Sequence, residues 1–167
     1  MSEFLNLDVE ARREALLAAQ EQHVSNLPAY IIEKDYWVTI TLKVLYLVIA
    51  PKLSDRSPSP FVFKGGTSLS KCFNVINRMS EDIDLSLSLE LLDHDAVVKQ
   101  EGISRKKLQQ AANQIQDTAK KFVAETLFDE VSQELKKFDS SISLKIEDNG
   151  LDIGIYYPLA LGDDEYG

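Results

Sequence analysis

The sequence has a single cysteine, Cys72, which excludes an internal disulfide. No second cysteine or histidine stands at metal-ligand spacing from it, and this argues against a structural zinc site. Such sparing use of cysteine is typical of proteins in a reducing cytoplasm, and we predict that location. We expect the Cys72 side chain to act as a small buried hydrophobe.

Long apolar runs are also missing. The most apolar stretch, 44–50, lies between Lys43 and Lys52 and falls far short of the roughly 18 residues that cross a bilayer. The first 21 residues lack the basic, apolar and small-residue regions of a secretory signal. We therefore predict neither a membrane span nor secretion.

Basic residues are the minority among the charged ones. Lys and Arg total 18 against 27 Asp and Glu, so the formal charge is −9. Because phosphate neutralisation supplies most non-specific affinity for nucleic acid, this balance argues against a broad nucleic-acid footprint. A nucleotide partner would need a local site where a few lysines and divalent cations reverse the field.

The length of 167 residues, of which 44% are hydrophobic, suits one structural domain with a real core. We predict an N-terminal helical section over 1–55 and a core over 60–167, separated by the Ser- and Pro-rich stretch 51–60. In the first section Asp8 suits the N-cap of an amphipathic helix over 9–23. A second helix, with Pro28 in its first turn, runs to residue 49 and is apolar nearly all round, so it belongs in the core.

The second section alternates strand and helix signals. A short strand at 61–63 runs into Gly65-Gly66 and a helix over 67–76, and strict alternation predicts a strand over 82–89. The remaining elements are a helical insertion at 93–140, its helix running from a Ser104 cap to about Phe138, and a hairpin of 141–146 with 151–157. The fold class is α/β (α+β mixed): a small mixed sheet with N-terminal helices and a long helical insertion.

Two short patterns in this section carry chemistry. Gly65 and Gly66, between a strand and a helix start, let backbone N–H groups approach a phosphate closely. Asp82 and Asp84, two apart on a strand, point the same way and can hold one or two divalent metals that bridge phosphate oxygens. Lys64 and Lys71 flank the glycine turn and can neutralise phosphate charge. Together these residues predict a metal and phosphate site in one cleft.

Each pattern also has a plainer explanation. The glycines could form only a turn, and paired aspartates on an alternating strand are usually its solvated face. A P-loop is excluded because Ser70 stands where its second Gly belongs and Cys72 where its metal-binding Ser or Thr belongs. The joint order of strand, Gly-Gly turn, short helix and Asp-x-Asp strand favours the functional interpretation.

The blocks FKGGTSLSKCFNVINRMSEDIDLSL and IIEKDYWVT resemble the AbiEii/AbiGii toxins, nucleotidyltransferase-fold proteins of type IV toxin–antitoxin systems. The resemblance implies a cytoplasmic bacterial enzyme that binds a nucleoside triphosphate with Mg²⁺ and transfers a nucleotidyl group, in related toxins to tRNA acceptor ends, and it implies an antitoxin partner. It also implies that Asp82 and Asp84 ligate the metal. The expected nucleotide contacts are Gly65, Gly66, Thr67, Ser68, Lys71 and Ser80, and Lys64 joins the two aspartates as a candidate catalytic residue.

Some candidates keep a structural alternative. Ser80 suits a turn before the acidic strand as well as a phosphate contact. Lys64 suits a solvent-facing strand end, and Lys71 a surface helix position. The cluster Glu33-Lys34-Asp35 belongs to the resemblance, yet acids at a helix N-terminus are favourable in any protein, so we assign it no catalytic role.

A third carboxylate is expected in nucleotidyltransferases of this fold, on a strand that would follow 151–159. Because the sequence ends at Gly167, we expect an incomplete core with an open sheet edge that could pair with a second copy. Asp152 is the nearest substitute, but its place directly after a hairpin turn predicts a solvent-facing residue. The alternatives to an enzyme are a non-catalytic nucleotide-binding or interaction module and a purely structural role for the acidic strand.

Overall fold

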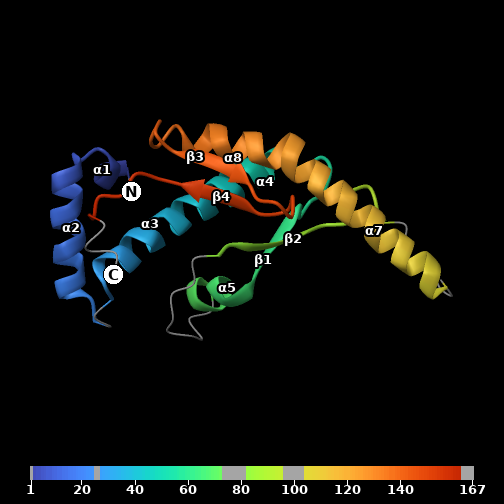
Figure 1. Cartoon of the computed structure of the whole chain (residues 1–167), viewed down its shortest axis with the longest axis horizontal. Coiled ribbons are helices and arrows are strands. Elements are labelled where there is room, and N and C mark those ends of the chain that lie inside the picture. Colours follow the sequence, from blue (N-terminus) through green and yellow to red (C-terminus); the bar gives the residue numbers. More distant parts are fainter. Residues whose placement is uncertain (1, 25–26, 73–81, 96–103, 163–167) are drawn as a thin grey trace.

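The computed structural model describes residues 2–24, 27–72, 82–95 and 104–162 (Figure 1). Within these ranges helices predominate, and four short strands complete the fold. This arrangement confirms the predicted α/β class with N-terminal helices and a long helical insertion. None of the described helices is both long and apolar enough to cross a membrane.

The N-terminal helices begin at the residues that cap them. The Asp8 Oδ1 atom accepts a hydrogen bond of 2.8 Å from the Ala11 N–H, as an N-cap should. Pro28 precedes the second long helix, which is buried along much of its length as its apolar sequence predicted. The elements are α1 (Ser2–Leu5), α2 (Val9–Gln22), α3 (Ala29–Lys43), the π-helical η1 (Val44–Ile49) and α4 (Ala50–Lys52).

The insertion forms one long helix with a π-helical segment in its middle. Ser104 caps it, as predicted, by accepting a hydrogen bond from the Lys107 N–H. Its parts are α7 (Arg105–Phe122), η2 (Val123–Leu127) and α8 (Phe128–Leu135). The second half is buried at Leu127, Val131 and Leu135, whereas the first half of α7 extends beyond the body of the molecule (Figure 1).

The strands form two antiparallel pairs, of which only the second is a hairpin. They are β1 (Phe61–Lys64) with β2 (Asp84–Leu87), and β3 (Ser143–Ile146) with β4 (Ile153–Tyr156), while α5 (Gly65–Lys71) follows β1 directly. The alternation predicted for the acidic strand is confirmed, because odd positions from Ile83 to Leu87 are half-buried and even positions are exposed. The predicted helix residues 73–76 lie outside the described residues.

The prediction of one small mixed sheet is wrong for the strands that the structure describes. They form two separate two-stranded sheets, and both pairings are antiparallel. Apolar side chains of β2 and β4 line one cavity, among them Leu85, Leu87, Ile153 and Ile155. An alternating strand needs one covered apolar face, and a second strand pair across a cavity can supply that cover as well as a larger sheet can. The alternating pattern therefore could not distinguish one sheet from two.

One buried apolar cluster joins the two sections of the chain. It includes Trp37, Ile40 and Val44 from α3 and η1, and Val131 and Leu135 from α8. The Trp37 and Tyr157 rings stack with centroids 4.9 Å apart, which brings the residues after β4 onto α3. The N-terminal helices therefore supply part of the core on which the strands pack.

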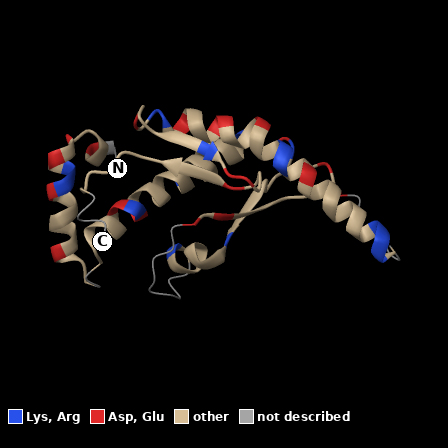
Figure 2. Cartoon of the chain, in the orientation of Figure 1, with Lys and Arg blue, Asp and Glu red and all other residues tan. Residues whose placement is uncertain are grey.

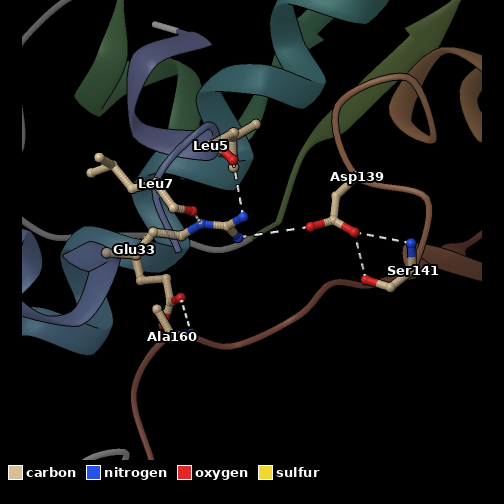
Figure 3. Close-up of polar contacts among 7 residues, drawn as sticks. Leu5, Leu7, Glu33, Asp139, Ser141 and Ala160 are labelled. Atoms are coloured by element: carbon tan, nitrogen blue, oxygen red, sulfur yellow. Dashed lines mark hydrogen bonds and ion pairs between the residues drawn. The ribbon is translucent and has the colours of Figure 1, made fainter. Parts of the chain in front are cut away.

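Polar contacts tie the N-terminal helices to the remainder of the chain (Figure 3). Arg12 donates hydrogen bonds to the Leu7 and Leu5 carbonyl oxygens, and its guanidinium lies 3.7 Å from an Asp139 carboxylate oxygen. Buried Glu33 accepts a hydrogen bond of 2.7 Å from the Ala160 N–H. These contacts fix α2 and α3 against residues far along the sequence.

Candidate nucleotide-binding site

A cavity of about 960 Å³ lies between α3, the long helix and the two strand pairs. Its wall is mostly apolar, with side chains such as Trp37, Val38, Leu127 and Ile155. Among the described lining residues five are charged, namely Lys34, Lys64, Asp82, Asp84 and Asp152. A concave, largely apolar cavity with a few converging charged groups is the usual form of a small-molecule site.

The two aspartates of the acidic strand reach this cavity together. The predicted strand 82–89 is shorter in the structure, so Asp84 is the first residue of β2 and Asp82 lies two residues before it. Both aspartates are exposed, and both line the cavity. The register of the strand pair sets Lys64, the last residue of β1, opposite Asp84. The structure therefore brings the three predicted catalytic residues, Lys64, Asp82 and Asp84, together where β1 ends and β2 begins.

Gly65 makes room for one of these carboxylates. Its φ is +74°, a conformation that residues with a side chain rarely adopt. A Cβ at this position would overlap the carboxylate of Asp84 and would lie only 2.8 Å from its Cγ. Gly65 is thus required both by the turn from β1 into α5 and by the close approach of the acidic side chain. Gly66 follows it in the first turn of α5.

The next two predicted nucleotide contacts direct their side chains inward. Thr67 is buried, and its hydroxyl donates a hydrogen bond to the Asp82 carbonyl oxygen. Buried Ser68 donates from its hydroxyl to the Gly65 carbonyl oxygen at 2.9 Å. These bonds hold the acidic strand and the glycine turn against α5, so both hydroxyls position the site rather than point into the cavity.

Lys71 forms a link between two helices. Its Nζ lies 2.8 Å from an Asp35 carboxylate oxygen and donates to the Thr39 hydroxyl at 2.9 Å. The ammonium is therefore engaged by α3, and Lys71 does not line the cavity among the described residues. Ser80, the last of the predicted nucleotide contacts, lies outside the described residues.

The cluster Glu33-Lys34-Asp35 contributes more than its sequence revealed. Buried Glu33 accepts a hydrogen bond from the Ala160 N–H, and Asp35 forms an ion pair with Lys71. Lys34 lines the cavity. From the sequence we assigned Lys34 no catalytic role. A signal existed, because Lys34 shares one helical face with Trp37, Val38 and Thr41, at spacings of three, four and seven residues, and is the only cation on that apolar face.

Asp152 lines the same cavity, but it is not grouped with the other acids. Within the described ranges no three acidic, histidine or cysteine side chains lie close enough together to hold a metal ion. The Asp152 Oδ2 atom accepts a hydrogen bond of 2.6 Å from Asn149, which holds it in the β3–β4 turn. Its exposure agrees with the predicted solvent-facing position.

The donor set fits a magnesium ion that arrives with a nucleotide. Mg²⁺ is commonly held by one or two carboxylates together with substrate phosphates and water. Asp82 and Asp84 supply two carboxylates at the start of β2, and Gly65 leaves the space that the Asp84 carboxylate occupies. Lys34 and Lys64 bring positive charge to the same cavity, as a polyphosphate requires.

Cys72 was expected to be buried, and this prediction is wrong. The residue is exposed at the end of α5. Cys72 lies one turn after buried Ser68 on the same face of α5, but it stands at the C-cap, where this face is no longer covered.

Comparison of the sequence with known proteins identifies a family. No curated protein and no solved structure matches the chain. Residues 54–158 match the family described as nucleotidyl transferase AbiEii toxin, type IV toxin–antitoxin system. This range is well over half of the chain and contains the glycine turn, both aspartates and the long helix. The chain therefore belongs to the AbiEii nucleotidyl transferase toxin family of type IV toxin–antitoxin systems.

Proposed function

We propose that this chain binds a nucleoside triphosphate together with Mg²⁺ in the cavity and transfers the nucleotidyl group to an acceptor hydroxyl, such as that of a tRNA end. The observation that carries the proposal is the close approach of Gly65 to Asp84, which places a carboxylate against the glycine turn at the edge of the cavity. The single cysteine fits a reducing cytoplasm as the place of action.

The residues would divide the work by charge. Asp82 and Asp84 would hold the magnesium ion, which when bound neutralises phosphate charge. Lys64 and Lys34 would neutralise the remaining phosphate oxygens from β1 and α3. Thr67 and Ser68 would keep the acidic strand and the turn in place through their hydrogen bonds. Catalysis by such a site rests on positioning and electrostatics.

In the transfer itself, the acceptor oxygen forms a bond to the α-phosphorus while the bond to pyrophosphate breaks. The hydroxyl proton passes to solvent. We assign no general base, because Asp152 is engaged by Asn149 in the hairpin turn.

Calorimetric titration with each nucleoside triphosphate, with and without Mg²⁺, tests the binding step. We expect magnesium-dependent binding by the wild type that Asp82→Ala/Asp84→Ala abolishes. A matched control is Asp129→Ala/Asp148→Ala, which removes two exposed aspartates from α8 and the β3–β4 turn and should bind as the wild type does. Absence of binding by the folded wild type would overturn the proposal.

A second candidate function is a nucleotide-binding module without turnover. It is favoured by the absence, in the described part of the chain, of a third carboxylate grouped with Asp82 and Asp84. Transfer of a radiolabelled nucleotide to total tRNA decides between the two. Incorporation that depends on both aspartates would establish the transferase, whereas tight binding without incorporation would establish the module.

Family membership also indicates an antitoxin partner. We further propose that the chain can pair with a second copy through a strand edge, because each described strand has a single pairing partner. Light scattering of the purified chain over a range of concentrations tests this. A monomer at all concentrations would exclude the pairing.

A further inference from the structure

The helix α7 reverses the charge balance of the chain. Over its 18 residues it carries five cations and one acid, a formal charge of +4, whereas the whole sequence has 27 acidic residues against 18 basic ones. Three of the cations, Arg105, Lys106 and Lys107, follow one another in its first turn. Cations at a helix N-terminus oppose the helix dipole, so this placement does not serve the stability of the helix.

These three cations are also exposed and without ion pairs among the described residues. Residues 104–110 are all exposed, and the basic tip stands at the end of the projecting helix (Figure 2). Several other cations are engaged, as Lys52 is by Glu130 and Glu134, and Lys71 by Asp35. The tip of α7 therefore offers cationic side chains that no acid in the described part of the chain neutralises.

The remaining polar side chains of α7 are of a kind that contacts nucleic acid. Five are amides that donate and accept hydrogen bonds, at Gln109, Gln110, Asn113, Gln114 and Gln116. Arg, Lys, Asn and Gln make many of the contacts to phosphates and sugars that position a protein on a nucleic acid. An acidic protein or peptide would need the cations but not this run of amides.

The same helix leads into the candidate site. Ile115 and Ala119, in its second half, line the cavity that contains Asp82 and Asp84. At 1.5 Å per residue α7 is about 27 Å long, so it extends from the cavity to a tip well outside the body (Figure 1). The exposed amides lie on a different face of α7 from Ile115 and Ala119. A strand bound at the tip would therefore follow α7 toward the body and cross to the cavity side at the second half of the helix.

We propose that α7 is the docking arm for a nucleic-acid acceptor, with the strand's phosphates on Arg105, Lys106 and Lys107 and its terminal hydroxyl directed to the cavity. This inference rests on the proposed nucleotidyl transfer, which requires an acceptor hydroxyl. It also resolves the conflict between a −9 chain and a polyanionic acceptor, because the positive charge is concentrated on one helix.

The test is fluorescence anisotropy with a labelled RNA hairpin that has a single-stranded 3′ end, measured over a series of salt concentrations. The variant is Lys106→Ala/Lys107→Ala, and its control is Lys136→Ala/Lys137→Ala, an adjacent and exposed lysine pair after α8 in which Lys137 is paired with Glu134. We expect the first variant to bind the RNA more weakly and to show a salt slope smaller by about 1 for each phosphate that it no longer neutralises. The control should leave both quantities unchanged.

Alanine in the first turn of α7 removes cations that oppose the dipole, so the variant should fold. No RNA binding by the wild type, or equal weakening of binding in both lysine variants, would overturn the docking arm. A DNA hairpin of the same sequence shows whether the arm requires ribose hydroxyls or phosphates alone. Nucleotide titration of the lysine variants and of Asp82→Ala/Asp84→Ala separates the two proposals. If Lys106→Ala/Lys107→Ala keeps both triphosphate binding and RNA binding, only the docking arm is wrong. If triphosphate binding is lost in the aspartate variant and kept in the lysine variants, the titration leaves the docking arm standing.

Discussion

Gly65 is the residue whose geometry most directly constrains the site. Replacement by alanine would strain a backbone with φ of +74° and push a methyl group into the Asp84 carboxylate. We expect Gly65→Ala to lose about 1–2 kcal/mol of unfolding free energy from strain and to lose magnesium-dependent nucleotide binding. Urea unfolding and calorimetry measure the two effects.

Gly150 provides the control for that variant. Its φ is +71°, nearly the same, but a Cβ there would meet only the flexible Lys120 side chain at 3.4 Å. Gly150→Ala should therefore show the strain and keep nucleotide binding. Equally weakened binding in both variants would mean that Gly65 acts through general stability and not through its approach to Asp84.

Lys34 is the second residue on which the site can be tested. Its Nζ lies 5.9 Å from the Tyr30 ring centroid, and its side chain lines the cavity with Lys64. A charge-assisted contact to phosphate contributes about 1.5–3 kcal/mol, so Lys34→Met should weaken triphosphate binding by about tenfold or more. Lys43→Met, an exposed change on the last turn of the same helix, should have little effect. Equal affinity in the Lys34 variant would remove Lys34 from the site.

Residues of the site could be predicted only where short-range spacing determines them. The Gly pair, Lys64 and the alternating aspartates lie within one strand–turn–helix–strand unit, so their proximity follows from local structure. Lys34 and the Lys71–Asp35 pair depend on how α3 packs against β1 and α5. Contacts across more than thirty residues are set by tertiary packing, which a single sequence does not reveal.

At the scale of elements, α5 is held to α3 by the Lys71 bridge. The Lys71 Nζ atom lies 2.8 Å from Asp35 and 2.9 Å from the Thr39 hydroxyl. In a double-mutant cycle of Lys71→Met and Asp35→Asn we expect a coupling of about 0.2–1 kcal/mol in the unfolding free energy, since Asp35 is partly exposed. Urea titrations of the four proteins give this value.

The same cycle distinguishes a positioning role from phosphate binding. If Lys71 only positions α5, Lys71→Met and Asp35→Asn should weaken triphosphate binding to a similar, small extent. Lys64→Met, which removes a cavity-lining cation, should weaken it more. A larger effect from Lys71→Met than from Lys64→Met would restore Lys71 as a direct phosphate ligand.

Elements themselves were predictable where capping and periodicity agree. Asp8 and Ser104 mark the starts of α2 and α7, and Gly150 marks the hairpin turn. The π-helical segments η1 and η2 leave no comparable signal, because neither contains a Gly or Pro. The separation of the strands into two pairs was missed because alternation specifies a buried face but no partner.

The whole molecule depends on residues outside the range that matches the family. That range is 54–158, yet the core cluster includes Trp37 and Ile40 from α3, and the cavity includes Lys34. The N-terminal helices therefore belong to the folding unit and to the site. Contacts that attach them to residues 54–158 should stabilise both the core and the cavity.

Asp139 is one such attachment, and its chemistry makes it sensitive to pH. Hydrogen bonds from the Ser141 hydroxyl and backbone N–H, at 2.6 and 2.9 Å, and the charge of Arg12 hold the pKa of Asp139 below its ordinary value. A lowered folded-state pKa means that the unfolded state binds more protons. The stabilisation is thus fully present above the unfolded pKa, about 3.9, and is lost as pH falls through the folded pKa.

Asp139→Asn should therefore cost about 1 kcal/mol of unfolding free energy near neutral pH, and the difference from the wild type should shrink as the wild-type carboxyl takes up its proton. Urea unfolding followed by circular dichroism, from about pH 7 to about pH 3, measures this. Asp148→Asn, an exposed change in the β3–β4 turn, should run parallel to the wild type throughout. If the unfolding free energies of the Asp139 variant and the wild type differ by the same amount at every pH, the carboxylate charge does not contribute. The ion pair with Arg12 then does not help to attach the N-terminal helices to the segment after α8.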